Sequence, residues 1–95
     1  MIQNIHEKIF TDLHISKDQL LSDMALLLAR QQLSEYSMEV DYYEKKYGKD
    51  FQEFDKMFRS LKASYEMEND WMSWKFAAET REYWQNIVGN IKNDY

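Results

Sequence analysis

Residues 26–48 read LLLARQQLSEYSMEVDYYEKKYG, and this stretch decides the fold. Its apolar residues recur at alternating steps of three and four, which is the heptad spacing of a helix that buries one side. The members of this heptad stripe are Leu26, Ala29, Leu33, Tyr36, Val40, Tyr43 and Tyr47. Gly48 follows, and glycine readily takes the left-handed conformation found just after a helix end. The stretch therefore predicts a long helix that ends at Tyr47.

Toward the N-terminus, Ser16 and Gln19 have the spacing of a capping box, so the long helix is predicted over residues 17–47. Its front carries a wider apolar face, made of Leu20, Leu21, Met24, Leu27 and Leu28. Residues 1–15 allow two interpretations. Ile2, Ile5, Ile9 and Leu13 have helical spacing, whereas Phe10, Leu13 and Ile15 suit a short strand. We favour a short helix.

After Gly48, Asp50 and Glu53 form a second capping pair, followed by apolar residues at helical spacing. These residues, Phe51, Phe54, Phe58, Leu61 and Tyr65, predict a second helix that ends near Ser64. Residues 66–69 then read as a short acidic connection. Asn69 or Asp70 is expected to cap a third helix that carries Trp71, Trp74, Ala78, Trp84, Val88 and Ile91.

The chain has no proline and only two glycines, so little interrupts these helices. Short connections between helices favour antiparallel neighbours. We therefore predict a single all-α domain over residues 1–95. It is expected to be an elongated antiparallel helical bundle of three main helices with a short N-terminal element.

Composition excludes several classes of function. The chain lacks cysteine, which removes disulfides and cysteine nucleophiles and suits the cytoplasm. No apolar run reaches membrane length, and no secretion signal is visible. The net charge is −5, which argues against nucleic-acid binding, since such binding depends on Lys and Arg. A basic protein is a suitable partner for an acidic chain.

The sequence contains no complete set of catalytic groups. His6 and His14 lie too far apart for a metal pair on one helical turn. The carboxylate pairs Asp41/Glu44 and Glu79/Glu82 lack the remaining ligands of a metal centre. We therefore expect no metal, no cofactor and no catalytic residue, and a metal-dependent carboxylate enzyme is the least favoured interpretation.

One group of residues is predicted to bind a partner. Glu66, Glu68 and Asp70 concentrate negative charge just before Trp71 and Trp74. Such a group either fills the core with its indoles or offers an aromatic anchor within an acidic rim. Arg81 falls within the apolar stripe of the third helix, either as a stem packed on tryptophan or as a partner contact.

Two segments carry a resemblance to a known family. Residues 43–54 read YEKKYGKDFQEF, and residues 68–77 read ENDWMSWKFA. Over roughly residues 33–80 the chain resembles the small antitoxins of bacterial and archaeal type II toxin–antitoxin systems. Members of that family often have Met-Ser after the glycine, where this chain has Lys49-Asp50. The resemblance implies direct binding and neutralisation of a small toxin.

The favoured function is accordingly that of an antitoxin that binds and masks a basic toxin, expected to be a ribonuclease. Partner contact is expected through Glu66, Glu68, Asp70, Trp71, Trp74 and Arg81. The alternative from another class is a structural or assembly module, a homodimer whose heptad stripe packs against its own copy.

Overall fold

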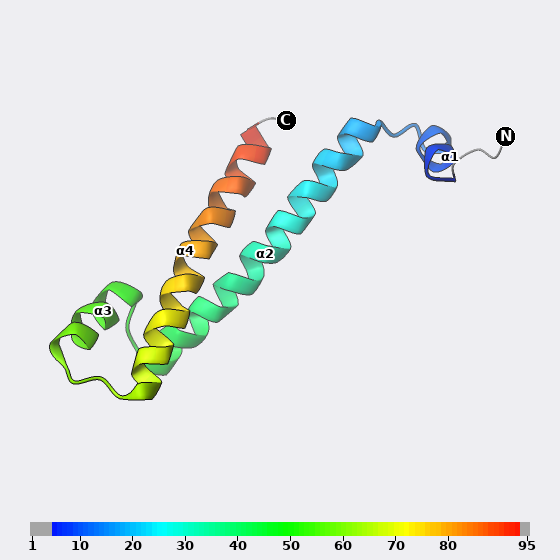
Figure 1. Ribbon diagram of the computed structural model, residues 1–95. Helices are drawn as coiled ribbons and strands as arrows, with labels where there is room; N and C mark the ends of the chain where they lie inside the picture. The colour runs from blue at the N-terminus through cyan, green and yellow to red at the C-terminus, as the bar shows by residue number, and fades with distance from the viewer. Residues whose placement is uncertain (1–4, 94–95) are drawn as a thin grey trace.

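The computed structural model describes residues 5–93 and forms four helices in an elongated arrangement. They are α1 (Ile5–Asp12), α2 (Lys17–Tyr47), α3 (Phe51–Ser60) and α4 (Tyr65–Asn93). The two long helices pack antiparallel, and α3 packs against α4 near the closed end of this hairpin (Figure 1). The predicted all-α architecture of three main helices and a short N-terminal helix is therefore confirmed. Ile2 lies outside the described residues.

The predicted caps are present at both ends of α2. The Ser16 hydroxyl oxygen accepts a hydrogen bond from the Gln19 backbone N–H at 3.3 Å. At the other end Gly48 takes a left-handed φ of 64°, and its N–H donates to the Glu44 carbonyl at 2.7 Å. His14 also takes a positive φ, 57°, in the turn between α1 and α2.

The boundary between α3 and α4 differs from the prediction. The second helix ends at Ser60 rather than near Ser64, and Leu61 is already extended. The fourth helix begins at Tyr65, because the Ser64 hydroxyl accepts a hydrogen bond from the Met67 N–H and so caps it five residues earlier than Asn69. Residues 66–69 are therefore the first turn of α4 and not a connection, a place where carboxylates are favoured by the helix dipole.

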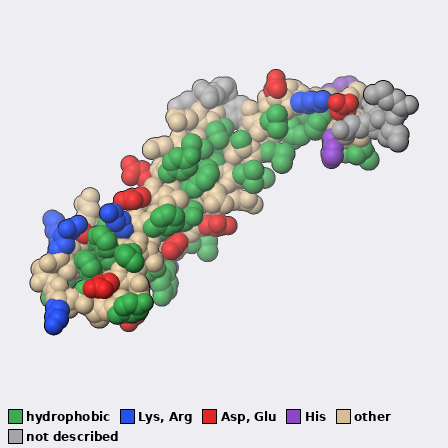
Figure 2. Space-filling model, in the orientation of Figure 1, with side chains coloured by type: hydrophobic (Ala, Val, Ile, Leu, Met, Phe, Trp, Pro, Cys, Tyr) green, Lys and Arg blue, Asp and Glu red, His purple; other side chains and the backbone are tan. Residues whose placement is uncertain are grey.

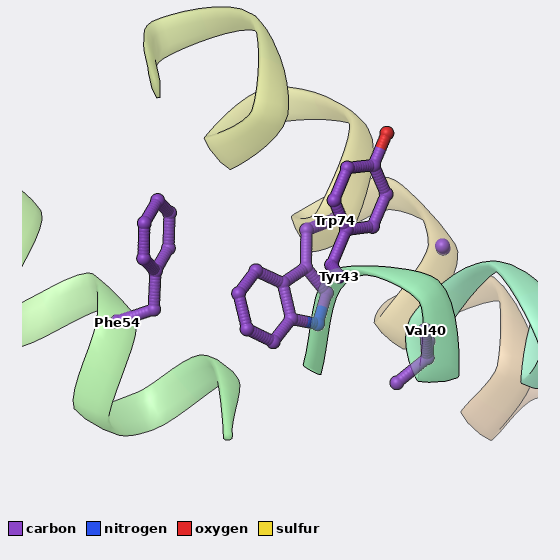
Figure 3. Close-up of a cluster of buried hydrophobic side chains, with 5 residues drawn as sticks. Val40, Tyr43, Phe54 and Trp74 are labelled. Atoms are coloured by element: carbon purple, nitrogen blue, oxygen red, sulfur yellow. The ribbon is translucent and has the colours of Figure 1, made fainter. Parts of the chain in front are cut away.

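The hydrophobic core lies at the closed end of the hairpin. Its buried members come from α2, α3 and α4 and are Val40, Tyr43, Phe54, Trp74 and Ala77 (Figure 3). The Trp74 indole stacks on Tyr43 at 5.7 Å and on Phe54 at 5.0 Å between ring centroids. Every member of the heptad stripe is at least partly buried, because α4 covers it. The predicted inner face of α2 is confirmed.

The molecule is far more extended than a compact domain of its length. Its radius of gyration is 20.3 Å, whereas a compact domain of 95 residues has about 12 Å. It exposes 7506 Å², whereas a compact monomer of 11.6 kDa exposes about 5,800 Å². Within the described range, no helix is both long and apolar enough to cross a membrane. The chain therefore exposes more surface to solvent than a compact domain of its size.

The two glycines allow a matched stability test. We expect Gly48→Ala to destabilise the fold by about 1 kcal/mol, because a Cβ disfavours its positive φ although nothing lies within 4 Å of it. Gly89 lies inside α4 with equal space around it, so Gly89→Ala is expected to stabilise by about 0.5–1 kcal/mol. Urea unfolding measures both, and a stabilised Gly48→Ala protein would contradict the cap.

Candidate protein-binding surfaces

The acidic residues before the tryptophans are partly engaged within the fold. Lys46 Nζ, at the end of α2, donates to Asp70 at 2.6 Å and to Glu66 at 2.7 Å. The Tyr47 hydroxyl also donates to the Asp70 carboxylate. Glu68 is exposed and makes no side-chain hydrogen bond or ion pair within the described part of the chain. We call the contacts of Asp70 and Glu66 with Lys46 and Tyr47 the α2–α4 clamp.

The pKa values around the clamp show how its groups depend on one another. Burial raises the pKa of the Asp70 carboxyl, but the hydrogen bonds from Lys46 and Tyr47 outweigh this, and the pKa lies below its ordinary value. Burial and the bond to Asp70 raise the pKa of Tyr47 to about 12. The contribution of Asp70 to stability is therefore present above about pH 4 and is lost as the pH falls through its folded pKa.

The two predicted indoles have different surroundings. Trp74 is 0% exposed and belongs to the core. Trp71 is partly buried, its Nε1–H donates to Asp55 at 2.8 Å, and its ring stacks on Phe58 at 5.2 Å. That hydrogen bond, with a second from Arg59, holds the pKa of the Asp55 carboxyl below its usual range. Trp71 therefore joins α4 to α3, and neither indole is fully available to a partner.

Arg81 lies apart from the clamp, in an open groove between α2, α4 and the start of α3. The groove has a volume of about 730 Å³, and Glu44, Asp50, Glu79 and Glu82 also line it. Arg81 is half-buried and makes no ion pair within the described residues. The six predicted residues thus have different surroundings: Glu66 and Asp70 lie in the clamp, Trp74 in the core, Trp71 against α3, Arg81 in this groove, and Glu68 on the open surface.

A surface that the sequence interpretation missed lies on α4. Tyr65, Met72, Phe76 and Tyr83 follow one another at steps of seven, four and seven, so they share one side of the helix. Each side chain is at least 57% exposed, and Trp74 faces the other side. We call these residues the α4 outer stripe. Their helical spacing is a signal that the sequence contains.

An acidic row runs beside the α4 outer stripe. Glu68, Glu79 and Glu82 are exposed, and their positions on the helix fall next to that stripe. Lys75, a basic residue between Glu68 and Glu79, has its Nζ 5.2 Å from the centre of the Trp71 ring. Figure 2 shows hydrophobic side chains along the shaft of the hairpin with carboxylates at its margins. The stripe and the row together form an apolar surface with an acidic border.

A second apolar surface lies at the N-terminal end. We call α1 and the first part of α2, residues 5–30, the arm. Its exposed large apolar side chains are Ile5, Ile9, Leu13, Leu21, Met24, Leu27 and Leu28. Figure 1 shows α1 beyond the end of α2, away from α3.

No known protein family, curated protein or solved structure matches this chain. Within residues 5–91, no group of three or more His, Cys, Asp or Glu side chains is placed to hold a metal ion.

Proposed function

We propose that this protein binds and masks a small basic protein, as an antitoxin neutralises its toxin, through the α4 outer stripe. The observation that carries the proposal is the exposed apolar stripe bordered by the carboxylates of Glu68, Glu79 and Glu82. Aromatic and methionine side chains are enriched where proteins bind one another, and acidic borders accelerate the approach of basic partners. A ribonuclease is a fitting toxin, because it carries positive charge to hold RNA.

The hairpin supports the stripe as a rigid platform. The core anchors Trp74 on the inner side of α4, and the α2–α4 clamp fixes the start of the same helix. Side chains on the outer side therefore keep their relative positions, and the Phe76 ring is also held by an edge contact at 6.0 Å with the Tyr36 ring on α2. Such a preorganised surface loses little conformational entropy when a partner binds.

The test begins with the product of the neighbouring gene. Co-expression is expected to relieve the growth arrest that this product causes alone, and the two chains are expected to co-purify. A neighbour that is not basic, or that does not bind the purified full chain, would contradict the proposal. These outcomes test the identity of the partner. A second measurement tests the position of the interface.

The interface is tested by surface plasmon resonance at two salt concentrations. The triple variant Glu68→Gln, Glu79→Gln and Glu82→Gln is expected to associate about tenfold more slowly in low salt, with a smaller loss in high salt. Phe76→Ala combined with Tyr83→Ala is expected to accelerate dissociation instead, because it removes buried contact area.

A control variant separates this local effect from a change in net charge. Asp12→Asn, Glu35→Gln and Asp41→Asn also remove three exposed carboxylates, but none of them lies on α4. This control is expected to associate nearly as fast as the wild type. Equal losses in both triple variants would show that only overall charge matters and that the interface lies elsewhere.

A further inference from the structure

The arm holds a larger share of the exposed large apolar side chains than its share of the chain length. It holds seven of the fourteen exposed large apolar side chains in the described part of the chain. Lys17 and Glu7 form an ion pair between α2 and α1 at 3.0 Å, and both side chains are more than half exposed. Substantial helix packing within residues 5–93 occurs only between α2 and α4 and between α3 and α4. The fold itself therefore leaves these apolar side chains of the arm exposed.

The available area is enough for a stable interface. The chain exposes 7506 Å², about 1,700 Å² more than the roughly 5,800 Å² of a compact monomer. A specific protein–protein interface buries about 800 Å² on each partner. The excess of the whole chain is thus about twice the area that one partner contributes to a single interface.

The charge of the arm favours a second copy of this chain as its occupant. Residues 5–30 hold four acidic and three basic side chains, whereas residues 31–91 hold twelve acidic and eight basic ones. Two nearly neutral arms meet with little electrostatic repulsion, and the acidity of the chain lies mostly elsewhere. A strongly basic toxin is complementary in charge to the hairpin, which is acidic, and not to the arm, which is nearly neutral.

We propose that the protein forms a twofold homodimer through its arms, with the apolar row of each arm packed on that of the other. A twofold contact uses the same surface on both copies, so one uncovered apolar row is sufficient to build it. The heptad stripe takes no part, because α4 already covers it. The dimer presents two α4 outer stripes, but its existence does not depend on the proposed toxin.

The test is the mass of the purified full-length chain in solution, measured by light scattering and sedimentation. The wild type is expected to have twice the 11.6 kDa mass of one chain. Leu21→Glu combined with Leu28→Glu places two charges one heptad apart on the arm, and this variant is expected to have the mass of a single chain. Both leucines are more than half exposed, so the monomer is expected to remain helical by circular dichroism.

Two further variants test whether α1 and the α4 outer stripe take part in the dimer. Ile9→Glu places one charge on α1 and is expected to weaken dimerisation at least tenfold. Met72→Glu combined with Tyr83→Glu makes equivalent changes on the α4 outer stripe and is expected to leave the dimer intact. A wild type with the mass of one chain, or a folded Leu21→Glu, Leu28→Glu protein that still dimerises, overturns the proposal.

Discussion

Trp74→Ala is expected to remove a large part of the stability of this fold. The indole is 0% exposed and contacts rings from both α2 and α3, so its loss opens a cavity where all three helices meet. Truncating a buried tryptophan typically costs about 3–5 kcal/mol. A domain of 95 residues has roughly 5–14 kcal/mol in total. Urea unfolding followed by circular dichroism measures the loss.

Two variants serve as controls for this prediction. Trp74→Phe keeps a ring in place and removes the buried Nε1–H, which has no hydrogen-bond partner within the described residues, so a smaller loss is expected. Met72→Ala, two residues away and 58% exposed, is expected to change stability by less than about 0.5 kcal/mol. Equal urea midpoints for Trp74→Ala and Met72→Ala would show that the core lies elsewhere.

Val40→Glu is expected to be nearly as disruptive for an electrostatic reason. Val40 is 2% exposed in the seam between α2 and α4, where a carboxylate loses its hydration. An uncompensated buried charge costs about 3–5 kcal/mol. Met38→Glu places the same charge two residues earlier on the same helix, where the side chain is 68% exposed, and is expected to be nearly neutral. Thermal unfolding at pH 7 compares the two, and equal melting temperatures would disprove burial of the stripe.

Local signals in the sequence were sufficient for most of the fold. The heptad stripe, the Ser16 cap and Gly48 each report on one helix and its immediate ends, and all three predictions are confirmed. They succeed because hydrophobic spacing and capping depend on neighbouring residues rather than on distant contacts.

The start of α4 and the role of the tryptophans were less predictable. Ser64 and Asn69 are both good caps, and the earlier start also brings Asp70 to Lys46, twenty-four residues away in sequence. Trp71 and Trp74 are three residues apart and share a helical side, so spacing alone does not separate an indole in the core from one that bonds Asp55 on α3. The start of α4 and the surroundings of each indole depend on tertiary contacts, and residue spacing in the sequence does not report on such contacts.

The position of the core at one end of the hairpin gives the molecule a gradient of local opening. Val40 and Trp74 lie near the closed end, whereas Ala29 and Val88 are the buried residues nearest the open end within the described range. Local unfolding requires less free energy where fewer buried contacts must be broken. Amide hydrogens near the open end are therefore expected to exchange with solvent sooner than those beside Trp74. The two long helices are expected to separate first at that end.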